Sequence, residues 1–144
     1  MRGWVHHVDF TVSDLERSGP FYNAVLSFLG YHQSDKGDTW IDWDMGAQHC
    51  APSVAIRLAR HDRSHDRYSC GLHHLAWAAD SRADVNRLHN LLVEIGATVL
   101  DPPSDYPEYR AGYYALFFAD PDGLKLEFVH TPGWTNENKR FDTA

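Results

Sequence analysis

The sequence has no long apolar run and little cysteine, and each of these scarcities excludes a class of protein. No stretch approaches the roughly 18 apolar residues that a membrane-spanning helix needs. Residues 1–4 lead into strand-like sequence without the apolar region of a signal peptide, so we expect a cytoplasmic protein that does not bind membranes. Two cysteines, Cys50 and Cys70, form no CxxC pair, and free thiols in a reducing compartment are the simpler interpretation.

Positive charge is also scarce. The chain carries 13 Lys and Arg residues against 20 Asp and Glu residues, its formal net charge is −7, and its basic residues are scattered. Nucleic acids are bound through basic stripes, so we expect a small-molecule partner instead. With 144 residues, 43% of them apolar, the chain can bury one sizeable core but not the cores of two ordinary domains. We therefore expect a single domain over residues 1–144.

The sequence does contain an internal repeat. Residues 5–12 reappear as residues 72–79, and both copies alternate like a short strand and carry two adjacent histidines. Each copy is followed by a polar helix-start signal and by a helical pattern that ends at a glycine. In the first helix the Gly-Pro pair at 19–20 suits a first turn, so we place its main part from Ser18, with Ser18 as the cap.

Three strand-like runs follow each helix. They lie near residues 31–34, 39–44 and 53–59 in the first half, and near residues 98–100, 113–119 and 124–129 in the second. Each half thus predicts a βαβββ module. The boundaries are about 3–60 and 71–131 for the modules, 61–70 for a charged linker and 132–144 for a C-terminal tail, which we interpret as a loose arm or a clasp on a partner chain.

Three segments resemble the vicinal-oxygen-chelate superfamily, which includes glyoxalase I, bleomycin-resistance proteins, fosfomycin-resistance thiol transferases and extradiol dioxygenases. They are residues 7–22, 73–77 and 118–127, and they occur in that family's order and spacing. The resemblance covers about residues 3–130. It implies an α+β fold in which two tandem βαβββ modules form a curved, cleft-lining mixed sheet with the helices on the outside.

In this family the metal ligands come from the first and last strands of the modules. The first-strand positions fall on His7 and His74, and the last-strand position falls on Glu127. The adjacent histidines His6 and His73 leave the choice within each pair open; we take the second of each and place the first on the opposite strand face. The leucines of the final strand share the core face, which leaves Glu127 on the concave side of the sheet.

The fourth family position is a departure. An alignment of residues 53–58 with the final strand places Arg57 where glyoxalase I has a second glutamate, and a guanidinium cannot ligate a cation. The resemblance then implies that two histidines and one glutamate hold one divalent metal ion, which can be Fe, Mn, Zn or Ni, with open positions for water or substrate. Such an ion can bind two adjacent substrate oxygens and stabilise an enolate, alkoxide or catecholate.

Further candidates surround these ligands. Asp9 lies two residues from His7 on the same strand face and joins Glu127 as a candidate catalytic carboxylate. Arg57 is a candidate for holding an anionic substrate group, with a surface ion pair as the alternative. The aromatic candidates for the substrate pocket, for each of which core packing is the alternative, are Trp40, Trp43, Trp77, Tyr106, Tyr109 and Tyr113.

The leading hypothesis is a divalent-metal-dependent enzyme acting on a small substrate chelated through vicinal oxygens, with lyase or isomerase, dioxygenase and thiol-transfer chemistry all open. Arg57 argues against an ordinary glyoxalase I, and Asp9, where the thiol transferases normally have threonine, argues against fosfomycin. The alternative is a metal-free, drug-sequestering protein of the bleomycin-resistance type. Because family members of this size commonly pair, we expect a homodimer, in which His7 can meet His74 and Glu127 of the other subunit.

Overall fold

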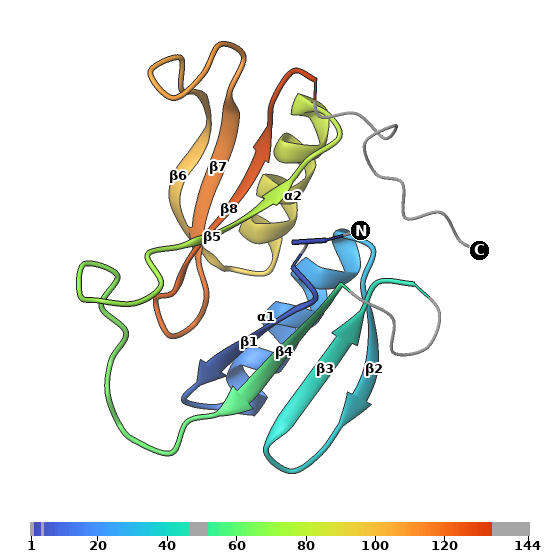
Figure 1. The fold of residues 1–144 in the computed structure, drawn as a ribbon, viewed down its shortest axis with the longest axis vertical. Helices are drawn as coiled ribbons and strands as arrows, with labels where there is room; N and C mark the ends of the chain where they lie inside the picture. Colours follow the sequence, from blue (N-terminus) through green and yellow to red (C-terminus); the bar gives the residue numbers. More distant parts are fainter. Residues whose placement is uncertain (1, 4, 47–51, 134–144) are drawn as a thin grey trace. The chain divides into compact units, whose positions relative to one another are not determined.

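The structure is a computed structural model, and it describes the chain except residues 1, 4, 47–51 and 134–144. The chain divides into two compact units between His65 and Asp66, within the charged segment 61–70. In the described residues, each unit has one helix and one four-stranded mixed sheet (Figure 1). Cys70 is exposed and free, whereas Cys50 and most of the predicted tail lie outside the described residues. No helix of the described part is long and apolar enough to cross a membrane.

The first unit is a βαβββ module with strand order β1-β4-β3-β2. Its elements are β1 (His7–Val12), α1 (Leu15–Phe28), β2 (His32–Lys36), β3 (Trp40–Asp44) and β4 (Ser53–Leu58). β1 and β4 run parallel, and the other neighbours are antiparallel. α1 packs on one face of this sheet, where Phe10 stacks on Tyr22 with 5.6 Å between centroids and the Trp43 indole donates to Asn23 at 3.1 Å. Strand alternation directs polar side chains to the other face.

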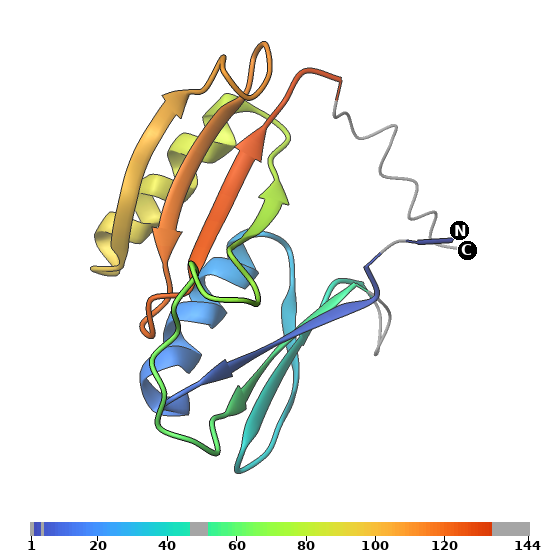
Figure 2. The same cartoon turned by 60° about the vertical axis from the view of Figure 1, so that its left-hand side comes forward.

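The second unit repeats the same order. Its elements are β5 (Leu75–Ala78), α2 (Arg82–Glu94), β6 (Thr98–Asp105), β7 (Tyr114–Ala119) and β8 (Lys125–His130). Its sheet has the order β5-β8-β7-β6, so each module pairs its first strand in parallel with its last. α2 lies along one face of the sheet (Figure 2). It buries Val85, Leu88 and Leu92. The predicted α+β fold of two tandem βαβββ modules is confirmed, with each module forming its own hydrogen-bonded sheet.

The predicted start of the first helix is wrong. α1 begins at Leu15, because the Asp14 side chain accepts hydrogen bonds from the backbone N–H groups two and three residues further on, at 2.8 and 3.2 Å. Ser18 is not the cap: it is buried inside the helix, and its N–H bonds to the Asp14 carbonyl at 3.0 Å. The expectation failed because α1 accommodates Pro20 beyond its first turn, a position that proline normally avoids.

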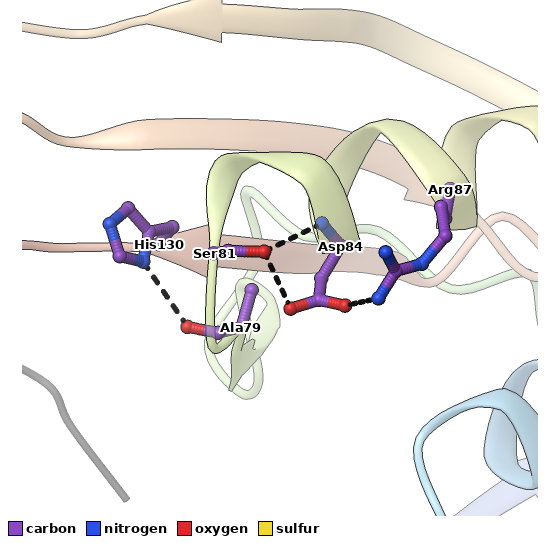
Figure 3. Close-up of polar contacts among 5 residues, drawn as sticks. All are labelled: Ala79, Ser81, Asp84, Arg87 and His130. Atoms are coloured by element: carbon purple, nitrogen blue, oxygen red, sulfur yellow. Dashed lines mark hydrogen bonds and ion pairs between the residues drawn. The ribbon is translucent and has the colours of Figure 1, made fainter.

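α2 has a serine cap, shown in Figure 3. Ser81 Oγ accepts a hydrogen bond from the backbone N–H of Asp84 at 3.1 Å and donates one to Asp84 Oδ2 at 2.8 Å. Arg87 binds the other oxygen of the same carboxylate. His130 Nδ1, at the end of β8, lies 3.4 Å from the Ala79 carbonyl. These contacts fix the point where the chain leaves β5 and enters the helix.

β6 is longer than the predicted run near residues 98–100. It continues to Asp105 although it contains two prolines, Pro102 and Pro103. β6 is an edge strand, and its pairing with β7 shifts register between Asp101 and Ser104. Because proline is tolerated at sheet edges and bulges, the two prolines do not end this strand.

Candidate functional site

His74 and Glu127 lie side by side in the second unit. The strand register pairs Ala76 with Glu127, so the glutamate points to the same sheet face as the histidine two residues before Ala76. His74 Nε2 is 3.0 Å from Glu127 Oε2. The Glu127 side chain is 2% exposed and the His74 side chain is 35% exposed. The carboxylate is therefore buried, and the imidazole stands between it and solvent.

Tyr113 is the second partner of this buried carboxylate. Its hydroxyl donates a hydrogen bond to Glu127 Oε1, so each carboxylate oxygen has a partner. Burial, reinforced by the hydrogen bond to Glu127, raises the pKa of Tyr113 well above its ordinary value. The hydroxyl consequently keeps its proton at physiological pH and remains a donor.

Tyrosines from the β6–β7 connection gather beside this pair. The rings of Tyr106 and Tyr109 stack with 5.5 Å between centroids, and Tyr113 meets both of them edge-on. Tyr106 also contacts Phe117, whose ring lies 6.4 Å from that of His74. Tyr109 is 64% exposed. We call these four rings the aromatic surface; the apolar part of a small molecule can pack on a surface of this kind.

The first unit holds a polar cavity of about 200 Å³ on the sheet face opposite α1. It is lined by His7, Asp9, Ser34, Asp42, Asp44, Ser53, Val54, Ala55 and Arg57. Arg57 Nε donates to Asp9 Oδ2 at 2.7 Å, and Arg57 Nη2 lies 3.7 Å from Asp42 Oδ1. Burial raises the pKa of Asp42 even though the Arg57 charge opposes the shift. The structure thus brings Arg57 and Asp9 together in the cavity that His7 also lines.

The strand register corrects the alignment with the second glutamate of glyoxalase I. β1 and β4 pair Asp9 with Ala55, and β5 and β8 pair Ala76 with Glu127. In both modules the candidate ligand histidine lies two residues before the first-strand member of the pair. Ala55 is therefore the counterpart of Glu127, and an alanine side chain has no donor for a metal.

Arg57 lies two residues beyond that counterpart and pairs with Thr11. The placement of Arg57 at the second-glutamate position is wrong by two residues, which is one full alternation of side chains along a strand. A shift of two residues leaves a side chain on the same face of the sheet, so the alternation of the sequence could not detect it. The conclusion that this position supplies no ligand still holds.

None of the three tryptophan candidates lies at the His74–Glu127 pair or lines the polar cavity of the first unit. Trp43 is fully buried in the first core. Trp40 pairs with Arg57 across β3 and β4 but is not among the residues that line the cavity, and its ring covers Gly37 in the β2–β3 turn. Trp77 pairs with Phe128, on the sheet face opposite to Glu127.

Both histidine pairs adopt an arrangement that the sequence reasoning missed. His73 Nδ1 lies 2.8 Å from His74 Nδ1, and His6 Nδ1 lies 3.1 Å from His7 Nδ1. In each pair the rings meet edge-on, with centroids 5.0 and 5.3 Å apart. The assignment of the first histidine to the opposite strand face failed because both pairs lie at or before the first residue of their strand. The sequence signal that could have predicted this contact is the His-His pair that occurs once in each module.

The donors of the second unit fit a divalent metal ion. His74 Nε2 and Glu127 Oε2 lie 3.0 Å apart, and an imidazole nitrogen with a carboxylate oxygen is a pair of donors that divalent metal ions take. Without an ion, the same contact is a hydrogen bond from the imidazole to the carboxylate. His7 belongs to the other unit, and no group of three His, Cys, Asp or Glu side chains suited to one ion forms among the described residues. The complete triad stays a prediction.

Comparison with known proteins identifies the family. The model of the Glyoxalase/Bleomycin resistance protein/Dioxygenase superfamily matches residues 4–128. The chain therefore belongs to this superfamily, and the resemblance predicted from the three sequence segments is confirmed.

Individual relatives agree with this assignment. The chain is 32% identical over 125 residues to the uncharacterized protein YqjT of Bacillus subtilis (strain 168), covering 87% of this chain and 97% of that protein. It is 30% identical over 127 residues to the metallothiol transferase FosB of Lysinibacillus sphaericus (strain C3-41), covering 88% and 81%. The crystal structure of a proposed glyoxalase from Bacillus halodurans superposes with a TM-score of 0.75 at 28% identity, covering 90% and 97%.

Proposed function

We propose that the chain is a divalent-metal-dependent enzyme that acts on a small substrate bound through two adjacent oxygens. The observation that carries this proposal is the contact between His74 Nε2 and the buried Glu127 carboxylate, whose 3.0 Å separation suits two ligands of one ion. His7 would supply the third ligand. When bound, the ion would provide the positive charge that stabilises an enolate, alkoxide or catecholate.

Other side chains would orient Glu127, accept a proton from the substrate and bind an anionic substrate group. Tyr113 holds one oxygen of Glu127, which leaves the other oxygen to face His74. Asp9 is the candidate base beside His7, with Oδ1 as the proton acceptor because Arg57 engages Oδ2. The Arg57 side chain is 46% exposed despite its two carboxylate neighbours, so it can still donate hydrogen bonds to an anionic group of the substrate.

Three reaction classes are compatible with this site: lyase or isomerase, dioxygenase and thiol transfer. The similarity to metallothiol transferase FosB makes thiol transfer the first class to assay. Asp9, in place of the threonine normal in the thiol transferases, directs that assay toward acceptors other than fosfomycin. Oxygen uptake is the second assay, to be run if the protein is found to hold iron.

Elemental analysis tests the metal site directly. The wild type, Glu127→Ala and Glu94→Ala are purified without chelators or a polyhistidine tag. Glu94 is an exposed glutamate at the end of α2, so its variant controls for the loss of one carboxylate. We expect roughly one equivalent of metal per chain in the wild type and the control, and none in Glu127→Ala. Wild-type protein that stays metal-free after reconstitution would overturn the proposal.

The second candidate function is metal-free sequestration of a drug. The observation that favours it is the aromatic surface, because packing between Tyr106, Tyr109 and a ligand needs no ion. The two functions differ in their response to a chelator. If the affinity for a small molecule is unchanged after a chelator removes the metal, the result supports sequestration. If binding is lost, the result supports the metal-dependent enzyme.

We also propose that the chain acts as a homodimer in the cytoplasm. The duplicated module and the family's common pairing support the dimer, and the exposed free Cys70 is compatible with a reducing compartment. Sedimentation equilibrium is expected to give the mass of two chains. The mass of one chain, with metal bound, would show that the site closes within a single chain.

A further inference from the structure

We propose that His73 and His6 are positioning residues that set the tautomer of the adjacent ligand histidines. The inference rests on the proposed metal site. In each pair the contact joins two Nδ1 atoms, at 2.8 Å between His73 and His74 and at 3.1 Å between His6 and His7. It occurs once in each module, so two separate parts of the chain arrive at the same geometry.

A hydrogen bond between two Nδ1 atoms fixes the roles of both rings. A neutral imidazole carries one N–H, so one Nδ1 must hold the proton and the other must offer its lone pair. His74 Nε2 lies 3.0 Å from the buried Glu127 oxygen and donates its proton to that carboxylate when no metal is bound. His74 Nδ1 is then the acceptor, and His73 Nδ1 is the donor.

This hydrogen bond must reverse when His74 Nε2 becomes a ligand. A ligating nitrogen carries no proton, so the Nε2 proton leaves to solvent and the proton of the His74 ring resides on Nδ1. That proton comes from His73 Nδ1, and His73 takes one from water at Nε2, on an exposed side chain. The pair holds two protons before and after. His73 therefore provides the acceptor that the metal-bound tautomer of His74 requires.

The polar cavity distinguishes the ligand from the positioning residue in the first module. His6 occupies Nδ1 of His7, which leaves His7 Nε2 available. His7 lines the polar cavity of the first unit, whereas His6 is not among the lining residues. In the second module the His73 ring is held edge-on by Tyr68 at 5.9 Å. Both pairs thus assign the second histidine to the metal and the first to its orientation.

The test compares a variant that removes the acceptor with one that restores it. His73→Leu removes the acceptor, and His73→Asn keeps a polar atom near the position of Nδ1. Co(II) titration, followed by the visible absorption of the bound ion, measures affinity without any substrate. We expect His73→Leu to bind Co(II) about tenfold more weakly than the wild type and His73→Asn to regain most of the loss. Urea unfolding of the metal-free variants checks that both remain folded.

Long-range ¹H–¹⁵N NMR spectra report the tautomers directly. In the metal-free wild type we expect the proton on Nε2 of His74 and on Nδ1 of His73, and both assignments reversed after Zn(II) is added. An unchanged His73 tautomer on loading, or His73→Leu binding Co(II) as tightly as the wild type while Glu127→Ala binds none, overturns this inference alone. A wild type that binds no metal overturns the proposed function, and the metal-free tautomers then still decide whether the histidine pair is hydrogen-bonded as inferred.

Discussion

Glu127 keeps a carboxylate almost entirely out of water, with Tyr113 and His74 each holding one of its oxygens. A buried charge without partners costs several kcal/mol, because the protein interior replaces water poorly. Its two partners therefore stabilise the fold as well as orient a ligand. At this residue, folding and the proposed metal binding would depend on the same contacts.

The Tyr113 hydroxyl can be removed without removing its ring. Tyr113→Phe keeps the edge-on contacts with Tyr106 and Tyr109 but leaves Glu127 Oε1 without its donor. We expect the free energy of unfolding, measured in urea at neutral pH, to fall by about 2 kcal/mol, as for other hydrogen bonds to charged groups. Tyr109→Phe alters an exposed ring and is expected to change the same quantity by less than about 0.5 kcal/mol. Equal losses in both variants would contradict this assignment.

At the scale of elements, the β7–β8 turn sets where β8 begins. Asp120 is buried, and its Oδ1 accepts hydrogen bonds from the backbone N–H groups of Asp122 and Leu124 at 2.9 and 2.8 Å. The turn leads directly into the strand whose register places Glu127 opposite Ala76. A side chain outside the candidate site therefore helps to position Glu127, the proposed metal ligand.

Asp120→Ala removes both of these hydrogen bonds, whereas Asp120→Asn keeps an oxygen acceptor at the same place. We expect Asp120→Ala to lower the free energy of unfolding by about 1–3 kcal/mol, because one buried and one half-buried N–H group lose their acceptor. The asparagine variant should lose clearly less, and Co(II) binding should weaken in the same order. An asparagine variant as damaged as the alanine variant would show that the charge of Asp120, and not its acceptor, matters.

α2 and β6 are tied together by an ion pair that gives a pH prediction. Arg82 Nη2 donates to Asp105 Oδ2 at 2.8 Å, and this hydrogen bond lowers the pKa of Asp105 below its ordinary value. A carboxyl whose pKa is lowered by folding stabilises the fold above its unfolded pKa of about 3.9, and that stabilisation is lost as the pH falls through the folded value.

Arg82→Gln is accordingly expected to raise the pKa of Asp105 toward its ordinary value, as measured by ¹³C NMR titration of the side-chain carboxyl. Arg87→Gln removes a neighbouring arginine that binds Asp84 instead, so it should leave the Asp105 titration unchanged. The stability difference between Arg82→Gln and the wild type should shrink as the pH drops below about 4. A difference that persists in acid would rule out Asp105 as its cause.

The sequence predicted the order of the elements but not all of their boundaries or contacts. Apolar periodicity and the glycines Gly30 and Gly96 predicted where each of the two helices stops, because apolar spacing and backbone freedom are local properties. Ser18 and Arg57 were misassigned because each depended on how the chain is accommodated elsewhere: a proline tolerated inside α1, and a strand register that alternation leaves ambiguous by two residues. The hydrogen bond from the Tyr113 hydroxyl to Glu127 forms because the β6–β7 connection folds back toward β8, and no local sequence pattern predicts that path.

At the scale of the whole molecule, the candidate ligands are divided between the two units. His7 belongs to the first unit, and His74 and Glu127 belong to the second. The proposed three-ligand site could be completed within one chain or between the two chains of a dimer. The distinction matters because a site shared between chains would make metal binding depend on protein concentration.

Mixing two defective variants separates these arrangements. His7→Ala and Glu127→Ala each remove a different ligand, and each alone is expected to bind no metal. If the site is shared between subunits, a refolded equal mixture regains about one site for every four chains, because half of the dimers are mixed and each holds one intact set of ligands. We expect this partial recovery of Co(II) binding. A mixture that binds nothing would place all three ligands in one chain.

The two halves share one hydrogen-bonded arrangement, and at the equivalent strand pair Ala55 stands opposite Asp9 in the first half and Glu127 stands opposite Ala76 in the second. At this pair the carboxylate lies on the first strand of the first module and on the last strand of the second. Substitutions around Ala55 can reshape the polar cavity without altering Glu127. The duplicated framework thus carries an arginine–carboxylate cluster in one copy and a buried, hydrogen-bonded carboxylate in the other.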